Sequence, residues 1–283
     1  MTYGMPYTGS KNGIAETLIS ILPSGKRFVD LFGGGGAMTH CAVLSGKYEG
    51  VLYNEVLPLV ADTFRKAING YYAPENFKPY WVSREDFFRL RESDGYAALC
   101  FSFGNNMENY FCGEDLEQKK CELFNTGKYK GETGNQAATA LARLARLARL
   151  ARLARLARRC PIEVRCGDYA AYEYREGDVV YCDPPYVTNE TKKRIYRNDQ
   201  SKRKEAFQFR YADFYDWVNT RDFPVYVSGY ALPDERFQAV TVISKRAIFA
   251  QTGNGTRKQE YLYTQKRYAP ERAIVSSEQI CLV

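Results

Sequence analysis

The sequence is poor in the residues that metal centres and histidine-based catalysis require. His40 is its single histidine, and none of its eight cysteines belongs to a CxxC pair. Zinc-finger spacing is therefore absent, no resident metal is expected, and a histidine base is disfavoured. His40 falls in a segment predicted to be helical, where we expect a structural role for it. Scattered, unpaired cysteines fit a reduced cytoplasmic protein with free thiols.

Long apolar runs are also missing. No segment approaches the roughly 20 apolar residues that a membrane span needs, and residues 1–6 lack the basic and apolar regions of a signal peptide. We therefore expect no membrane contact. The 283 residues, 45% of them apolar, suffice for one large domain or for a core with an insertion.

The net charge of +7 is concentrated in one segment. Residues 141–159 contain seven arginines and no acid, and the other 33 basic residues balance the 33 acidic ones. Net charge is therefore weak support for nucleic-acid binding. A local cluster after residue 186 is better support, because its basic side chains are interleaved with Tyr196, although a solvated loop is the alternative. The cluster includes Lys192, Lys193, Arg194 and Arg197.

The tetrapeptide Asp183-Pro184-Pro185-Tyr186 is the most informative motif. It follows the apolar run of residues 179–182, so it is predicted to stand where a buried strand ends. Two prolines stiffen the exit, and a carboxylate, a carbonyl and an aromatic ring are presented together at the carboxyl edge of a sheet. These groups suit a flat heterocycle with an exocyclic amine, whereas a rigid strand-to-loop turn is the alternative interpretation.

A second pattern near the amino terminus predicts a nucleoside site. Residues 27–32 read as a strand, Gly33–Gly36 as a turn, Ala37–Leu44 as a helix and residues 51–54 as a second strand that ends in Glu55. Glycines permit close approach of a ligand, and the acid can accept both hydroxyls of a ribose. Position 38 is Met38 rather than the third glycine of GxGxxG, so S-adenosylmethionine fits at least as well as NAD.

Predicted strands and helices alternate up to residue 60 and again after residue 160, but not between residues 61 and 160. We predict a mainly helical insertion over 61–160 and a catalytic domain from 1–60 plus 161–283. Strands are predicted at 162–166, 178–182, 224–228, 240–244 and 260–264, which makes seven with the first two. A hairpin signal at Gly253-Asn254-Gly255 makes part of the sheet antiparallel. The expected class is an α/β fold with a seven-stranded mixed sheet.

Six consecutive Leu-Ala-Arg triplets occupy residues 141–158 and predict a helix, because all three residue types are strong helix formers. A three-residue repeat slips back about 60° per triplet on an α-helix. The leucines therefore wind around the helix instead of forming one stripe. A basic arm along DNA and a length-variable spacer are the two main interpretations, with the spacer slightly favoured and a membrane-surface helix third.

The order of these motifs resembles the Dam-like (alpha-class) DNA adenine-N6 methyltransferases of the phage and prophage type, over nearly the whole chain. Tyr7-Thr8-Gly9-Ser10-Lys11 looks like the family's amino-terminal motif. Asp30-Leu-Phe-Gly33-Gly-Gly35 looks like its DxFxGxG loop, and Glu55 stands where the family usually has Asp. Residues 167–169, 225–230 and 254–257 resemble further motifs.

The resemblance implies a Rossmann-like, S-adenosylmethionine-dependent enzyme with double-stranded DNA as its partner, acting as a monomer in the cytoplasm of a bacterial or phage-infected cell. The residues implied for the cofactor are Tyr7, Lys11, Asp30, Phe32, Gly33, Gly35, Glu55, Asp168 and Asp183. The residues implied for catalysis are Asp183, Pro184 and Tyr186. Candidate DNA contacts, besides the cluster that follows residue 186, are Asn105, Asn106, Lys245, Arg257 and Lys258.

The expected reaction needs hydrogen bonds from the adenine amine to the Asp183 carboxylate and the Pro184 carbonyl, which favour a localised lone pair on nitrogen. The base is flipped out of the duplex and stacked on Tyr186. Cys182 is expected to pack in its strand. The open alternatives are the same fold acting on cytosine N4, RNA adenine or a protein amide, a non-catalytic DNA-binding protein, and more distantly a nicotinamide oxidoreductase.

Overall fold

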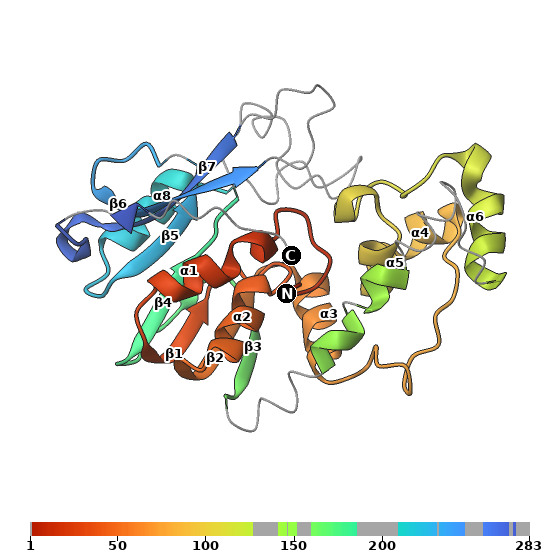
Figure 1. Ribbon diagram of the computed structural model, residues 1–283, viewed down its shortest axis with the longest axis horizontal. Coiled ribbons are helices and arrows are strands. Elements are labelled where there is room, and N and C mark those ends of the chain that lie inside the picture. The colour runs from red at the N-terminus through yellow and green to blue at the C-terminus, as the bar shows by residue number, and fades with distance from the viewer. Residues whose placement is uncertain are drawn as a thin grey trace. The chain divides into compact units, whose positions relative to one another are not determined.

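A computed structural model describes residues 2–126, 141–145, 147–151, 160–185, 209–230, 232–246, 257–271 and 274–275. The chain forms two compact units, residues 1–178 and residues 179–283 (Figure 1). All seven predicted strands are present within a mixed α/β fold, and a short additional strand follows them. The proposed insertion at 61–160 lies inside the first unit, and its boundaries remain a prediction.

Three parallel strands form the sheet of the first unit. They are β1 (Gly25–Asp30), β2 (Tyr48–Glu55) and β3 (Ile162–Cys166), with β2 in the middle. Residues Val51, Leu52 and Tyr53 are all buried, as expected for a parallel strand covered on both faces. Parallel pairing places the carboxyl ends of the three strands at one edge.

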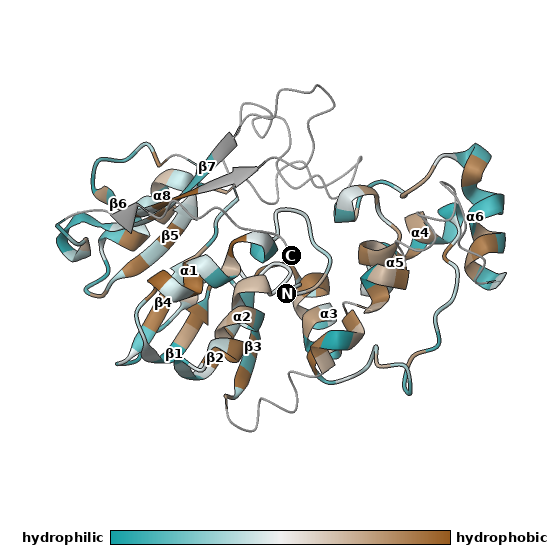
Figure 2. Ribbon diagram, in the orientation of Figure 1, coloured by the Kyte–Doolittle hydropathy of each residue, from teal (hydrophilic) through white to brown (hydrophobic). Residues whose placement is uncertain are grey.

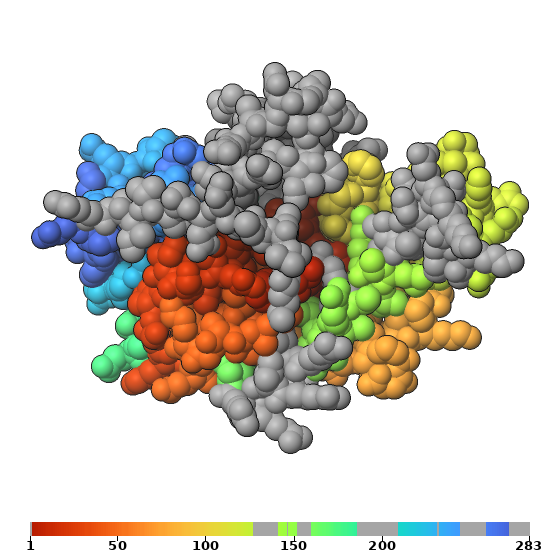
Figure 3. Space-filling model, in the orientation of Figure 1, coloured from red at the N-terminus to blue at the C-terminus, as the bar shows by residue number. Residues whose placement is uncertain are grey.

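Helices α1 (Ala15–Ile21), α2 (Ala37–Ser45) and α3 (Pro58–Ile68) belong to the same unit, with the 3-10 turn η1 (Lys11–Gly13) before them. Helix α2 packs on β1 and β2, and α3 packs on β2 and β3. Residues of the red and orange segments form a closely packed surface (Figure 3). The structural role predicted for His40 is confirmed, because its Nδ1 accepts a hydrogen bond from the Gly4 N–H at 3.1 Å.

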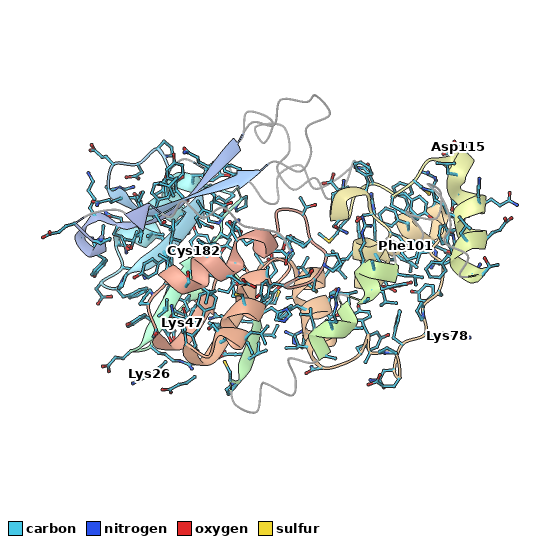
Figure 4. The ribbon with its side chains drawn as sticks, in the orientation of Figure 1. Lys26, Lys47, Lys78, Phe101, Asp115 and Cys182 are labelled. Carbon is cyan, nitrogen blue, oxygen red and sulfur yellow. The ribbon has the colours of Figure 1, made fainter. Side chains whose placement is uncertain are left out.

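The described part of the insertion is helical, as predicted. It contains α4 (Arg84–Leu90), α5 (Gly95–Cys100), the 3-10 turn η2 (Phe103–Asn105) and α6 (Glu114–Thr126). Helix α5 is apolar almost throughout, whereas α6 is mostly polar with a few apolar residues (Figure 2). The buried ring of Phe101 (Figure 4) lies 5.4–6.1 Å from four other aromatic rings, those of Trp81, Tyr96, Phe111 and Phe124. These aromatic contacts give the insertion a core of its own.

Residues 141–145 and 147–151 of the Leu-Ala-Arg repeat are helical, as predicted, and they are packed. Leu144, Leu147 and Leu150, from three successive triplets, are buried. The Arg143 guanidinium donates from Nη1 to the carbonyl oxygens of Cys100 at 2.9 Å and Ser102 at 2.8 Å. The Cys100 carbonyl belongs to the last residue of α5 and the Ser102 carbonyl lies just beyond it, where a cation is favoured by the helix dipole. This part of the repeat therefore packs within the insertion, where Arg143 joins it to the end of α5, and both main interpretations stay predictions.

A buried charge cluster lies near the end of the first unit. Arg27 Nε donates to Asp178 Oδ1 at 2.9 Å, and Arg27 Nη2 donates to Oδ2 at 2.7 Å. The Tyr172 hydroxyl also donates to Oδ2, at 2.5 Å. The 3-10 turn η3 (Tyr169–Ala171) precedes this tyrosine. A bidentate pair with a third donor satisfies a carboxylate that is largely removed from water.

The second unit is a mixed sheet in the order β4-β5-β7-β6-β8. Its strands are β4 (Asp178–Cys182), β5 (Val225–Gly229), β6 (Phe237–Arg246), β7 (Arg257–Gln265) and β8 (Ile274–Val275), with helix α8 (Tyr211–Asn219) and the 3-10 turn η4 (Lys266–Tyr268). Strands β4 and β5 are parallel, whereas β6 and β7 are antiparallel. The predicted antiparallel pairing of the hairpin is confirmed, and its turn falls outside the described residues. Cys182 is buried in β4, as predicted (Figure 4).

Candidate active site

Asn54 joins the carboxyl ends of the three parallel strands. Its backbone carbonyl accepts the Gly33 N–H at 2.8 Å. Its side-chain Nδ2 donates to the carbonyl oxygens of Leu31 at 3.0 Å and Gly167 at 2.9 Å. With 2% of its surface exposed, this side chain holds the three strand-to-loop exits in fixed relation. This role of Asn54 was not predicted from the sequence, although an asparagine between an apolar run and an acid was a usable signal.

Glu55 is held beside the glycine loop. Its Oε2 accepts the Gly34 N–H at 2.8 Å, and its Oε1 accepts the Leu57 N–H at 3.0 Å. Burial raises the pKa of this carboxyl, although the backbone hydrogen bonds oppose the shift. Because each oxygen is anchored by one N–H, the plane of the carboxylate is fixed. Binding of the two hydroxyls of a ribose by these oxygens stays a prediction.

The glycine loop is closely packed against the protein's own rings. A Cβ atom on Gly33 would lie 2.2 Å from the Tyr53 ring, and one on Gly35 would lie 2.7 Å from the Tyr7 Cβ. Gly34 has a φ of +47°, which disfavours any residue with a side chain. The Tyr53 hydroxyl also donates to the Gly34 carbonyl at 2.7 Å. Aromatic packing is therefore one physical reason for these glycines. Tyr7 lies against the loop, and its contact with a cofactor stays a prediction.

Two predicted cofactor residues lie in the interior of the first unit. The Asp30 carboxylate, at the end of β1, accepts a hydrogen bond from the Thr39 hydroxyl at 2.8 Å. Lys11 is buried in η1. Asp30 thus fixes the start of α2 to the strand that precedes the glycine loop. This is a positioning role, and the structure leaves direct contact with a cofactor untested.

Phe32 and Asp168 lie near the same edge of the sheet. The Phe32 ring stacks on the Tyr169 ring, with centroids 5.3 Å apart and planes at 27°. Asp168 is exposed and accepts the Ala170 N–H at 2.7 Å, so it caps η3. The backbone N–H of Gly167 donates to the Glu55 carbonyl at 3.2 Å. The segment after β3 is thereby attached to the segment after β2, and a shared cofactor site at these segments stays a prediction.

The second unit carries the strand end with the paired prolines. Asp183 follows β4, and its Oδ1 accepts a hydrogen bond from the Ser228 hydroxyl of β5 at 3.1 Å. The Tyr211 hydroxyl of α8 donates to the Pro185 carbonyl at 2.6 Å. Burial, with nearby Tyr215, raises the pKa of Tyr211 to about 12, so it remains a donor at neutral pH. Pro184 is buried between these anchored residues, and Tyr186 lies outside the described part.

The candidate DNA contacts are only partly described. Asn105 Nδ2 donates to the Leu99 carbonyl at 2.9 Å, and Asn106 Oδ1 accepts the N–H groups of Glu108 at 2.9 Å and Asn109 at 3.1 Å. Both amides thus shape a turn, and contact with bases stays a prediction. The backbones of β6 and β7 are paired at Lys245↔Lys258 and Arg246↔Arg257. The cluster Lys192, Lys193, Arg194 and Arg197 lies outside the described residues.

Phe103, at the start of η2, has an exposed side chain. It is 66% exposed, the highest value among the large apolar side chains of the described segments. The following Gly104 and Asn105 have φ values of +58° and +59°, and the Thr8 hydroxyl donates to the Gly104 carbonyl at 2.6 Å. An apolar ring is therefore held in solvent by an anchored turn. Phe103 was not among the residues that the sequence predicted to contact DNA.

Within the described residues, no helix is long and apolar enough to cross a membrane, and no three histidine, cysteine or acidic side chains are grouped to hold a metal ion. The donor set at the edge of β1–β3 is of a different kind. It consists of one anchored carboxylate, backbone groups and aromatic rings, which suits a nucleoside better than a metal.

Comparison with known proteins gives the family context. The model of the D12 class N6 adenine-specific DNA methyltransferase family matches residues 7–248. A protein of Escherichia phage P1 named DNA N-6-adenine-methyltransferase is 30% identical over 189 residues, which is 64% of this chain and 23% of the relative. The chain thus spans about a quarter of that relative's length. A Haemophilus influenzae crystal structure, assigned as a methylase, is 12% identical with a TM-score of 0.32, covering 89% of this chain and 88% of the other.

Proposed function

Because the chain belongs to the D12 class N6 adenine-specific DNA methyltransferase family, we propose that it transfers a methyl group from S-adenosylmethionine to N6 of adenine in duplex DNA. The observation that carries the proposal is the Asp183-Pro184-Pro185 strand end. Its carboxylate is oriented by Ser228 and its last carbonyl by Tyr211. A rigid carboxylate followed by prolines suits recognition of an exocyclic amine, which offers two N–H donors.

The cofactor would be held by residues of the first unit. Glu55 is an anchored acceptor pair for ribose hydroxyls, and Phe32 with Tyr169 offers apolar ring surface near Asp168. S-adenosylmethionine, when bound, supplies an electrophilic methyl group. The anchored loops contribute by holding their groups in place before binding, which reduces the entropy lost on association.

The substrate amine would be bound by Asp183 and by the carbonyl of Pro184. Acceptance of its two N–H bonds favours a nitrogen lone pair that is less delocalised into the ring. The rate of methyl transfer then depends on the positioning of the amine and on electrostatic stabilisation, and no covalent enzyme intermediate is formed. Reaching these groups requires a base extruded from the duplex, and Tyr186 is the proposed stacking partner. The insertion and the basic hairpin strands are proposed to contact the DNA.

Asp183→Asn and Asp183→Ala test the assignment. Wild-type protein is expected to place N6-methyladenine in duplex DNA, detected by mass spectrometry of digested DNA and by modified-base sequencing. Both variants should lose at least about 100-fold in kcat, because the carboxylate acceptor is lost, and should bind S-adenosylmethionine in calorimetry with only partly weakened affinity.

Asp222→Asn is a matched control, because Asp222 is exposed in the same unit, and it should keep wild-type activity. Retained methylation by the Asp183 variants would contradict the role of this residue. Methylcytosine as the product, or methylation of RNA alone, would replace the proposed substrate with one of the alternatives raised by the sequence.

A further inference from the structure

A chain of three hydrogen-bonding side chains runs from the interior of the second unit to Asp183. Ser228 Oγ donates to Asp183 Oδ1 at 3.1 Å, and Tyr181 Oη lies 2.8 Å from Ser228 Oγ. Tyr181 is fully buried, and Ser228 is 1% exposed. The contact between Asp183 and Ser228 joins residues 45 positions apart in the sequence.

The strand register explains why these groups meet. Strands β4 and β5 are parallel, with Tyr181 opposite Tyr226 and Cys182 opposite Val227. Continuing that register by one residue places Asp183 opposite Ser228. Tyr181 and Asp183 are two positions apart, so their side chains leave the strand on the same face. The sheet itself therefore places the hydroxyl groups beside the carboxylate.

The direction of these hydrogen bonds follows from the number of hydrogens that each group carries. A serine hydroxyl has one hydrogen, and Ser228 directs it to the carboxylate, which can only accept when ionised. The contact between Tyr181 and Ser228 then requires the tyrosine to donate. Each donation polarises the next, and in a buried setting such chains strengthen the final hydrogen bond.

We propose that Ser228 and Tyr181 are positioning residues for Asp183, with Tyr181 acting through Ser228. A hydrogen bond to Oδ1 fixes the rotation of the carboxylate about its Cβ–Cγ bond, and so sets the direction in which both oxygens face. An amine bound by Asp183 meets an acceptor that does not need to reorganise during the reaction. The inference rests on the proposed function, because it assigns roles within that site.

The same contacts would also arise if Ser228 only satisfied the buried Tyr181 hydroxyl. The two explanations differ in what removal of each hydroxyl does. A structural hydroxyl affects stability, whereas a positioning hydroxyl affects kcat and leaves cofactor binding unchanged. They also differ in coupling, since a residue acting through Ser228 has no effect on kcat once Ser228 is gone.

Kinetics of the purified full chain on duplex DNA test this. Ser228→Ala should lower kcat about tenfold, the value of one hydrogen bond to a charged group, with the KM for S-adenosylmethionine within about twofold of wild type. Tyr181→Phe should lower kcat about threefold, in line with a weaker neutral hydrogen bond. Tyr181→Phe in the Ser228→Ala background should cause no further loss of kcat, and Ser228→Thr, which keeps a hydroxyl, should recover most of it.

Thr264→Val is the matched control, since Thr264 carries a buried hydroxyl on β7 that bonds to Gln265 rather than to Asp183. It should retain kcat within about twofold. Unchanged kcat in Ser228→Ala, or additive losses in the double variant, would overturn the positioning roles while the proposed function stands. Wild-type protein that methylates no adenine would overturn the proposed function and the positioning roles together.

Discussion

The carboxylate of Glu55 accepts the backbone N–H of Gly34 at 2.8 Å, so the acid after the second strand and the glycine loop after the first are directly bonded. Glutamine at this position keeps one acceptor oxygen but replaces the other with an NH2 group, which cannot accept from a backbone N–H. One of the two anchors is then lost together with an acceptor for ribose.

Glu55→Gln should weaken binding of S-adenosylmethionine at least about tenfold, or 1.4 kcal/mol, measured by isothermal titration calorimetry. Glu49→Gln is the control, because Glu49 is an exposed acid on the same strand. Equal affinity in both variants would show that Glu55 only anchors the loop.

The buried pair of Arg27 and Asp178 should make stability depend on acid pH. Burial alone would raise the pKa of Asp178, but the hydrogen bonds from Arg27 and Tyr172 outweigh it, and the pKa lies below its usual range. The stabilisation is therefore present above the unfolded-state pKa of about 3.9 and is lost as the pH falls through the lower folded-state value.

Arg27→Met should lower the free energy of unfolding by about 3 kcal/mol at pH 7, and the difference from wild type should shrink below about pH 4. Urea unfolding from pH 7 to pH 2.5 measures this. Arg89→Met breaks an exposed pair with Asp86, which water screens, and should cost far less stability than Arg27→Met. A difference that does not change with pH would contradict the electrostatic origin.

Phe103 should contribute to DNA binding. Its ring is exposed on an anchored turn, and stacking of a base on an aromatic ring is worth about 1–3 kcal/mol. Phe103→Ala should weaken binding of a short duplex about tenfold or more without lowering the free energy of unfolding. Phe88→Ala, which removes a 47% exposed ring from α4, is the control. Fluorescence anisotropy measures both affinities. Equal affinities of the two variants for the duplex would contradict a role of Phe103 in DNA binding.

The described part of the Leu-Ala-Arg repeat should contribute to stability rather than to DNA affinity. Leu147 is fully buried, and its replacement by alanine should cost about 3 kcal/mol of unfolding free energy. Arg149→Ala removes an exposed arginine of the same segment and should cost less than about 0.5 kcal/mol. If Arg149→Ala instead reduced DNA affinity strongly and Leu147→Ala left stability unchanged, the repeat would be interpreted as a basic arm along DNA rather than as a packed helix.

The sequence was sufficient to predict the seven strands. The buried strands β2 and β4 read as continuous apolar runs, and Gly33 and Asp183 mark where the chain leaves β1 and β4. The family resemblance was also confirmed. The glycine loop and Glu55 were predicted to serve one site. The hydrogen bond between them shows that they are adjacent, and cofactor binding by both stays a prediction.

Tertiary contacts of single side chains could not be predicted in the same way. Asn54 bonds to Gly167, which is 113 positions away, and no local pattern marks such a partner. The pairing of Ser228 with Asp183 depends on strand register, which the sequence does not specify without knowledge of strand order. The exposure of Phe103 depends on positive φ angles in the turn, which the prediction of a mainly helical insertion did not include.

The docked leucines Leu144, Leu147 and Leu150 come from identical triplets, so the repeat maps onto itself when the chain is shifted by three residues. Addition or loss of a whole triplet would therefore present the same side chains to the same surface, with another arginine in the place of Arg143. In the gene, such a change is a nine-nucleotide step that preserves the reading frame. The insertion can thus change in length over evolutionary time while its packed interface keeps the same sequence.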